Sequence, residues 1–231
     1  MVTKVSHAVQ ELYDAGLHVG FSRTRRHPSA EKYLYSQKGK NDIFDLEKTH
    51  ASLDDALAAI TSIYKTGGKI LFVGGKNEAR DSVRSAAISC AMPYVAGRWI
   101  GGTLTNYREI RKRVDRLEKL VADKDSGGFE KYTKKERVIL DREIANLTEM
   151  FGGITTMKDR PQALFIIDPR HDDAAVREAN DLKVPVIALA NTDCDFGRIQ
   201  FPIPGNDATK KSISAITTAV ARALNGATKT A

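Results

Sequence analysis

The chain has few of the residues that build disulfide frameworks, metal sites and membrane spans. It contains two cysteines, five histidines and one tryptophan among 231 residues. Cys90 and Cys194 lack disulfide-framework or metal-ligand spacing, so we expect free thiols in a reducing compartment. No apolar run reaches the length of a membrane span, and the first residues lack the apolar core of a signal peptide. These absences predict a cytoplasmic protein without a bound metal or other cofactor.

The charge that is present is mainly positive. Thirty-six Lys and Arg residues face 29 Asp and Glu residues, which gives a formal net charge of +7. This excess favours polyanionic partners, but many enzymes share it, so the position of the charges matters more. A first basic cluster lies between Phe21 and Lys40, with Tyr33 and Tyr35 among the cations. Its candidate RNA-binding residues are Arg23, Arg25, Arg26 and Lys32.

Continuously apolar segments alternate with amphipathic ones over much of the chain. Residues 69–73, 163–167 and 184–189 are continuously apolar apart from Lys69 at the start of the first, which is typical of strands buried on both faces of a parallel sheet. Helical spacing is expected over residues 6–15, 77–92, 173–182 and 207–224, and in a helix that Ser52 caps. Short strands are expected over residues 43–46 and 93–95. The pattern predicts a Rossmann-like or flavodoxin-like three-layer α/β sandwich with a central parallel sheet.

The segment 105–151 interrupts this alternation with two helical patterns and no strand. The first places Tyr107, Ile110, Val114, Leu117 and Val121 on one face, and the second opens with Thr133 and Glu136 at the spacing of a capping box. We expect an antiparallel coiled-coil hairpin that projects from the sandwich. The predicted domains are therefore the sandwich, residues 1–104 and 152–231, and the inserted hairpin, residues 105–151.

Three loops after expected strands are candidate reaction centres. Gly74-Gly75-Lys76 resembles a phosphate-binding loop, yet it fits neither the P-loop pattern nor GxGxxG. The segments 168–173 and 191–195 carry acids, one histidine and Cys194, but a helix cap and solvated loops explain them more simply. We expect no enzyme. The alternative is a Rossmann-like enzyme that binds a nucleotide or a sugar phosphate at Lys76.

A second basic cluster surrounds the start of the expected hairpin. Arginine guanidinium groups, hydroxyls and amides bind phosphates, and an aromatic ring can stack on an exposed base. A solvated helix face and a core role for the tryptophan are the simpler alternatives, while an adaptor that grips a partner helix would need an apolar outer face on the hairpin. The candidate RNA-binding residues of this cluster are Arg98, Trp99, Thr103, Thr105, Asn106, Arg108, Arg111, Lys112, Arg113 and Arg116.

The segment RWIGGTLTN at residues 98–106 resembles the bacterial-type small-subunit ribosomal protein S2 family. The likeness continues in order through LYDAGLHVG at 12–20, FDLEKT at 44–49, ILFVGGK at 70–76, FGGI at 151–154, PQALF at 161–165, NTDCD at 191–195 and IPGND at 203–207. It implies an α/β sandwich with a protruding hairpin, and a non-catalytic protein of the small subunit near the junction of head and body. Its implied partners are small-subunit ribosomal RNA, neighbouring ribosomal proteins and ribosomal protein S1, which the family helps to recruit in bacteria. Phe21 stands where the family usually has a histidine.

Overall fold

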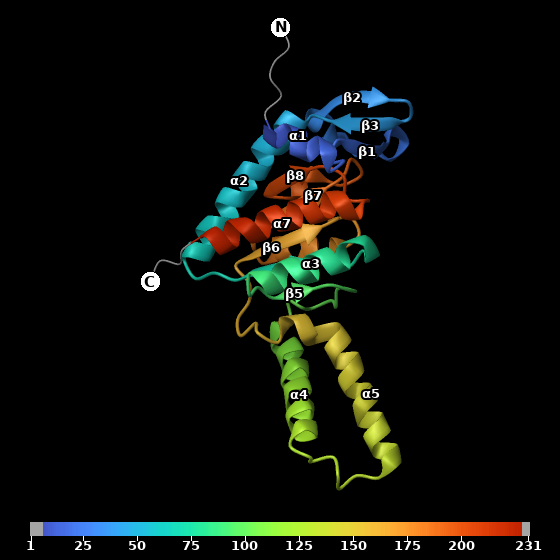
Figure 1. Cartoon of the computed structure of the whole chain (residues 1–231), viewed down its shortest axis with the longest axis vertical. Coiled ribbons are helices and arrows are strands. Elements are labelled where there is room, and N and C mark those ends of the chain that lie inside the picture. Colours follow the sequence, from blue (N-terminus) through green and yellow to red (C-terminus); the bar gives the residue numbers. More distant parts are fainter. Residues whose placement is uncertain (1–6, 228–231) are drawn as a thin grey trace.

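A five-stranded parallel sheet forms the centre of the molecule (Figure 1). The computed structural model describes residues 7–227. The strands lie in the order β5-β4-β6-β7-β8, and every neighbouring pair is parallel. Their bounds are β4 Ile70–Val73, β5 Tyr94–Val95, β6 Ala163–Ile167, β7 Val186–Ala190 and β8 Phe201–Pro204. The predicted α/β sandwich is confirmed, and its sheet gains a fifth strand, β8, that the apolar pattern did not reveal.

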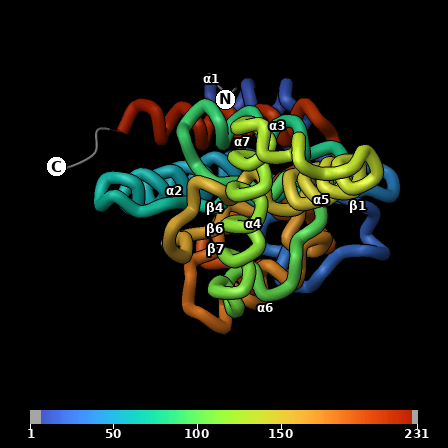
Figure 2. The backbone as a smooth tube through the Cα atoms, turned by 90° about the horizontal axis from the view of Figure 1, so that it is seen from below, coloured from blue at the N-terminus to red at the C-terminus, as the bar shows by residue number. Residues whose placement is uncertain are grey.

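Alternate side chains of each strand enter two separate cores, because successive residues of a strand point to opposite faces. Leu71 and Val73 pack into one core, while Ile70 and Phe72 pack into the other, and all four are fully buried. The second core receives α1 His7–Asp14, α2 Leu46–Lys65, α3 Asn77–Ser89 and α7 Lys210–Gly226. The first receives α6 Asp173–Asp181, which lies on the opposite side of the sheet in Figure 2. Both faces are therefore covered, as the continuous apolar strands require.

A small antiparallel sheet precedes the sandwich. Its strands β1 Val19–Ser22, β2 Leu34–Lys38 and β3 Asn41–Phe44 pair in the order β1-β3-β2. Two 3-10 turns, Arg23–Arg25 and Pro28–Tyr33, lie between β1 and β2. Most of β2 is exposed, so the apolar alternation that reveals a half-buried strand is missing.

Two long helices project from the sheet as a hairpin (Figure 1). α4 Tyr107–Asp125 follows β5, and α5 Lys134–Phe151 leads back through a 3-10 turn at Gly152–Ile154 to β6. The predicted capping box is present, because Thr133 and Glu136 exchange both hydrogen bonds. The predicted seam needs one correction: Leu120 is buried and Val121 is 38% exposed.

Two local predictions differ from the structure. Ser52 does not cap a helix but lies inside α2, which begins about two turns earlier. Asp45 caps it, and its Oδ1 accepts hydrogen bonds from the backbone of Glu47 and Lys48. The predicted strand over residues 43–46 is accordingly shifted toward Asn41–Phe44. Residue 6, the expected start of the first helix, lies outside the described residues. Within residues 7–227, no helix is both long enough and apolar enough to cross a membrane.

Candidate nucleic-acid interface

The glycine-rich loop before α4 closes around a carboxylate of its own chain. Oε1 of Glu178, on α6, accepts hydrogen bonds from Nε1 of Trp99 at 3.0 Å and from the backbone nitrogen of Gly102 at 2.8 Å. Oε2 accepts three more, at 2.9 to 3.0 Å, from the backbone of Leu104 and from the backbone and hydroxyl of Thr105. Gly102 has φ +89°, a conformation that glycine adopts without strain. The loop thus binds an anion, and this anion is the carboxylate of Glu178 in the same chain.

The electrostatics of Glu178 agree with this geometry. Burial alone raises the pKa of a carboxyl group, but the hydrogen bonds from Thr105, Trp99, Gly102 and Leu104 outweigh it. The pKa of Glu178 therefore lies below its ordinary value. A charged carboxylate occupies the loop at neutral pH, which leaves no room for a phosphate at the same donors.

Three predicted RNA-binding residues are corrected by this arrangement. Trp99 is 7% exposed, so the core alternative holds and its ring does not stack on an exposed base. Thr103 is buried and its hydroxyl donates to the carbonyl of Ile100. The hydroxyl of Thr105 donates to Glu178 instead of a phosphate. Sequence showed the donors but not the acid, which lies 73 to 79 positions further along the chain.

The loop Gly74-Gly75-Lys76 is also occupied from within. The backbone nitrogen of Gly75 donates to Oδ2 of Asp172 at 2.8 Å. Nζ of Lys76 lies 3.2 Å from Oδ2 of Asp168 and 3.7 Å from Oδ1 of Asp207. The amide and the ammonium that a nucleotide would need are bonded to protein carboxylates. The alternative of a nucleotide-binding or sugar-phosphate-binding enzyme therefore has no free anion site in this loop.

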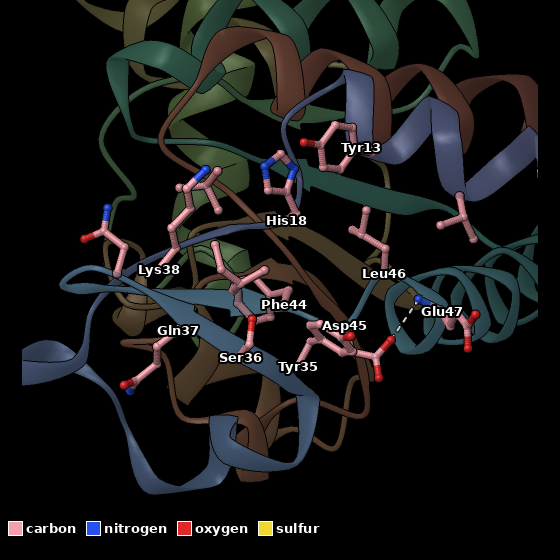
Figure 3. A pocket seen from close by; sticks show the side chains of 14 residues that line it. Tyr13, His18, Tyr35, Ser36, Gln37, Lys38, Phe44, Asp45, Leu46 and Glu47 are labelled. Carbon is pink, nitrogen blue, oxygen red and sulfur yellow. Dashed lines mark hydrogen bonds between the residues drawn. The ribbon is translucent and has the colours of Figure 1, made fainter. Parts of the chain in front are cut away.

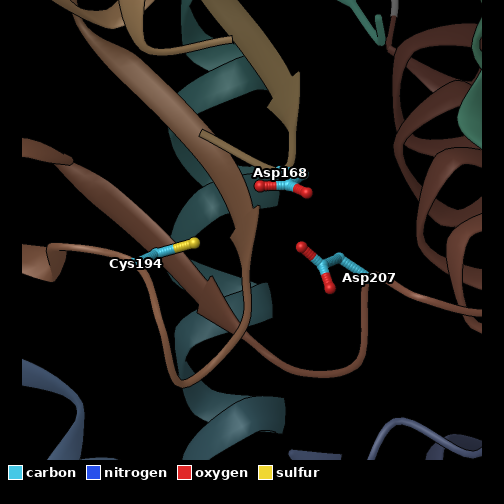
Figure 4. A group of neighbouring side chains, drawn as sticks. All are labelled: Asp168, Cys194 and Asp207. Carbon is cyan, nitrogen blue, oxygen red and sulfur yellow. The ribbon is translucent and has the colours of Figure 1, made fainter. Parts of the chain in front are cut away.

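Asp168, Cys194 and Asp207 meet at the carboxyl edge of the sheet (Figure 4). One ligand atom of each lies within 4.8 Å of the others, so among the described residues this group has the geometry to hold a cation. The ammonium of Lys76 already supplies a positive charge there. Burial raises the pKa of Asp207 to about 7, and its Oδ2 has no hydrogen-bond partner within the described chain. Burial also raises the pKa of Cys194, which keeps it a thiol and a poor nucleophile.

The cations of the N-terminal cluster divide into internal and exposed ones. Arg26 forms a bidentate pair with the fully buried Asp42, at 2.8 and 2.7 Å. Arg25 donates to Asp193 at 2.9 Å and lies over the ring of Phe21. Arg26 therefore stabilises the fold before it can contact RNA, because the buried carboxylate of Asp42 needs a cationic partner. The exposed residues Arg23 and Lys32 keep their charges at the surface.

The cations of the hairpin divide in the same way. Arg111 binds Asp115, Glu118 and the carbonyl groups of Thr155 and Met157, so it ties α4 to the segment after α5. Arg116 pairs with Glu143 across the two helices, and Lys112 pairs with Glu109. In contrast, Arg98, Arg108 and Arg113 are exposed, and the structure gives their side chains no ion pair or hydrogen bond with any described residue.

A hollow of about 720 Å³ lies at the base of the hairpin. Four cations line it against two acids, and one of them, Arg160, comes from the segment between α5 and β6. Sequence reasoning missed Arg160, although the run Lys158-Asp159-Arg160 beside the hairpin was a signal for it. The lining residues are Tyr107, Arg108, Arg111, Lys112, Asp115, Asp159 and Arg160. The base of the hairpin thus offers a positively charged hollow flanked by free arginines.

The two basic clusters do not meet. In Figure 1 the small sheet with the N-terminal cluster lies at one end of the molecule and the hairpin at the other. A polyanion that contacts both must be larger than a nucleotide.

One comparison with known proteins covers almost the whole chain. The family model described as ribosomal protein S2 matches residues 12–227. The match includes the central sheet, the loop around Glu178, both helices of the hairpin and both basic clusters.

Proposed function

The chain belongs to the ribosomal protein S2 family and is therefore a protein of the small ribosomal subunit, and from this premise we propose that it binds small-subunit ribosomal RNA through the base of its helical hairpin. Members of this family are structural constituents of the ribosome and not enzymes. Membership also implies ribosomal RNA and ribosomal proteins as partners.

The observation that carries the proposal is the set of unpaired cations at the hairpin base. Arg98, Arg108 and Arg113 lie in the loop and the first turns of α4, and their side chains make no ion pair or hydrogen bond with the described residues. Glu109 feels the charges of Arg108 and Arg113 without pairing with either. The hollow beside them adds Lys112 and Arg160. Arginine forks bind phosphate oxygens in pairs, and their binding releases counterions from the RNA. The other two arginines of α4, Arg111 and Arg116, form ion pairs with acids of the chain. The unpaired cluster is therefore the best candidate for the contact with RNA.

The N-terminal cluster supplies a second, weaker contact. Arg23 and Lys32 are exposed cations that form no ion pair with the described residues. Arg25 is half exposed, with 53% of its side chain accessible, and it can reach a phosphate while it keeps its bond to Asp193. A ribosomal RNA is long enough to reach both ends of the molecule. Contacts at the N-terminal cluster and at the hairpin base can therefore each add to the affinity of the same RNA.

The finer parts of the proposal rest on the family alone. They are a position near the junction of the head and body of the subunit, a role in recruiting ribosomal protein S1, and residence on cytoplasmic ribosomes. We further propose that the hairpin, residues 105–151, is an inserted unit within a sandwich of residues 1–104 and 152–231. Its projection from the sheet in Figure 1 supports that division.

The test is RNA affinity measured at several salt concentrations with the full chain. Each arginine that neutralises one phosphate contributes about one unit to the slope of log affinity against log salt. Arg108→Ala and Arg113→Ala should each weaken binding to small-subunit RNA and reduce the slope by roughly one unit. Lys65→Ala, an exposed cation at the far end of α2, is the matched control and should change neither quantity. Equal affinity and slope in all three variants would exclude the hairpin base from the interface.

A further inference from the structure

Two arginines from distant parts of the chain share one carboxylate at the carboxyl edge of the sheet. Oδ2 of the buried Asp193 accepts hydrogen bonds from Arg25 at 2.9 Å and from Arg170 at 2.7 Å. Arg25 follows β1, whereas Arg170 follows β6. Both arginine side chains are more than half exposed, at 53% and 57%. A guanidinium group has five N–H donors, so each arginine keeps donors that this bond does not use.

A second pair of arginines shares Asp173, the first residue of α6. Its Oδ1 lies 2.6 Å from Arg198, and its Oδ2 lies 2.5 Å from Arg177. The loops 168–173 and 193–198 are therefore tied together twice, once by Arg170 with Asp193 and once by Asp173 with Arg198. The two pairs are thus neighbours on one surface. We call them the α6 arginine group, which consists of Arg25, Arg170, Arg177 and Arg198.

The charge balance separates this group from the paired arginines of the hairpin. Arg116 faces one acid and Arg111 faces two, so acids fully compensate their charges. In the α6 arginine group, four cations share two carboxylates. Asp195, half exposed in the same loop, uses its Oδ1 to cap the 3-10 turn Phe196–Arg198. Even with Asp195 counted, the cations outnumber the acids by four to three.

The surface around the group suits a nucleic acid better than a protein. Asp168 is 13% exposed and Asp207 is fully buried, and Nζ of Lys76 lies 3.2 and 3.7 Å from their oxygens, so these acids do not reverse the surface charge. The large apolar side chains that are exposed in the described chain lie on α1, β2, α3 and the hairpin, and none lies in α6 or in its two neighbouring loops. A protein interface usually has an apolar centre, which this surface lacks.

The α6 arginine group lies between the two basic clusters. Arg25 belongs to the N-terminal cluster itself, in the 3-10 turn Arg23–Arg25. On the other side, Arg177 precedes Glu178, whose carboxylate holds the loop that follows Arg98. The N-terminal turn, this loop and the hairpin seam all pack into the first core, which is the core that α6 covers. The three sets of cations therefore follow one another along the same side of the sheet.

The small sheet offers no comparable surface at its pocket. A pocket of about 760 Å³ lies between α1, the start of α2 and the β2–β3 hairpin, and its lining, which includes Phe44 and Leu46, is mainly apolar (Figure 3). Its lining contains one lysine, Lys38, and two acids, Asp45 and Glu47. A polyanion is not attracted by this balance. The RNA path at this end of the molecule is therefore on the side of Arg25.

We propose that the α6 arginine group binds phosphates of the small-subunit RNA and joins the N-terminal cluster to the hairpin base. The proposal rests on the RNA-binding function proposed above and extends its interface to one continuous face. Guanidinium groups bind phosphate oxygens through two parallel donors. Asp173 and Asp193 already hold the arginines in place, which reduces the side-chain entropy lost on binding. A free nucleotide offers this surface few phosphates, so strong binding requires a polynucleotide.

The experiment removes one arginine from each pair of the full chain and measures the affinity for small-subunit RNA at several salt concentrations. Arg170→Ala and Arg177→Ala each leave the shared aspartate with one arginine, so the thermal midpoint should stay near that of the original chain. Each should reduce the slope of log affinity against log salt by roughly one unit, and the double variant by roughly two.

Two controls accompany these variants. Arg170→Lys keeps the positive charge and should keep the slope, although a lysine lacks the planar fork. Arg222→Ala removes an exposed arginine of α7, which packs on the other face of the sheet (Figure 2), and should change neither affinity nor slope. A slope that falls equally in Arg170→Lys and Arg170→Ala would assign Arg170 a structural role and overturn the phosphate contact.

The outcomes separate the two proposals. If the hairpin variants reduce the slope while Arg170→Ala and Arg177→Ala bind like the original chain, the α6 proposal alone is overturned. The same holds if these two variants keep their RNA affinity but weaken the binding of a ribosomal protein. If they reduce the slope and the hairpin variants do not, the α6 surface is supported and the hairpin contact is overturned. If the original chain does not bind RNA at all, both proposals fail.

Discussion

Nε1 of Trp99 donates a hydrogen bond to Oε1 of Glu178 at 3.0 Å, and both side chains are buried. The pair joins the loop before the hairpin to α6, and so fixes the start of α4 against the sandwich. A loop with the composition of a phosphate-binding site therefore orients the hairpin, and the proposed RNA contact falls to the cations beyond the loop.

Removal of the negative charge at Glu178 should destabilise the fold. Glu178→Gln places an amide group against backbone donors, so at least one buried donor loses its acceptor, at a cost of about 1–3 kcal/mol. The free energy of unfolding, measured by urea denaturation at pH 7, should fall by that amount. Glu149→Gln, an exposed acid on α5, is the control and should change little. Equal stability of Glu178→Gln and the original chain would contradict the assigned role of the carboxylate.

The stability should depend on pH through Asp207. Its pKa is raised to about 7 in the folded chain, whereas an unfolded aspartate has an ordinary value near 3.8. Between these values the folded state binds more protons, so this group favours folding at low pH and loses that contribution as pH rises through about 7. In Asp207→Asn, the gain in unfolding free energy on going from pH 8 to pH 5 should be smaller. An identical pH profile in both chains would show that Asp207 does not titrate in this window.

The pair between Arg26 and Asp42 should matter for folding more than for RNA binding. Arg26→Ala leaves the buried carboxylate of Asp42 without its cationic partner, which costs about 3–5 kcal/mol. Arg23→Ala removes an exposed cation and should leave the thermal midpoint nearly unchanged, while it reduces the salt slope of RNA binding by roughly one unit. Melting and salt titration of both variants check the division. If Arg26→Ala melts like the original chain, or Arg23→Ala melts far below it, the division is wrong.

Nucleotides and sugar phosphates should not stabilise the chain. The amide of Gly75 and the ammonium of Lys76 are bonded to Asp172 and Asp168, so no anion site is free at this loop. A ligand that binds only the folded state raises the melting temperature. A thermal-shift screen with nucleoside diphosphates, triphosphates and sugar phosphates should therefore show no rise. A clear rise that disappears in Lys76→Ala would revive the enzyme alternative.

Local patterns predicted the sandwich and the hairpin because their signals lie within single segments. The apolar run of β6 and the capping box of Thr133 and Glu136 are complete in five and four residues. The edge strand β2 escaped prediction because four of its five residues are exposed and carry no apolar alternation. The apolar spacing of α2 begins beside Ser52 and so predicts a cap there, while the true cap, Asp45, falls within the expected strand 43–46.

The candidate site could be predicted only in part, because a basic residue looks the same whether it faces RNA or an acid. Arg26 and Arg113 both stand in basic clusters, yet only Arg26 meets a buried carboxylate in the fold. That carboxylate, Asp42, lies in β3, one residue before the strand that the sequence predicts over residues 43–46. Glu178, on a helix far along the chain, decides the role of Trp99 in the same manner. Acids that are distant in the sequence thus decide which of these side chains stabilise the fold and which stay free at the surface.

The most direct test of the central claim is sedimentation of the chain with small ribosomal subunits in a sucrose gradient. The original chain and Lys65→Ala should sediment with the small subunit. The double variant Arg108→Ala and Arg113→Ala should move toward the top of the gradient as salt is raised, because it has lost two phosphate contacts. A double variant that stays with the particle as firmly as the original chain would contradict the claim that the base of the hairpin binds the RNA.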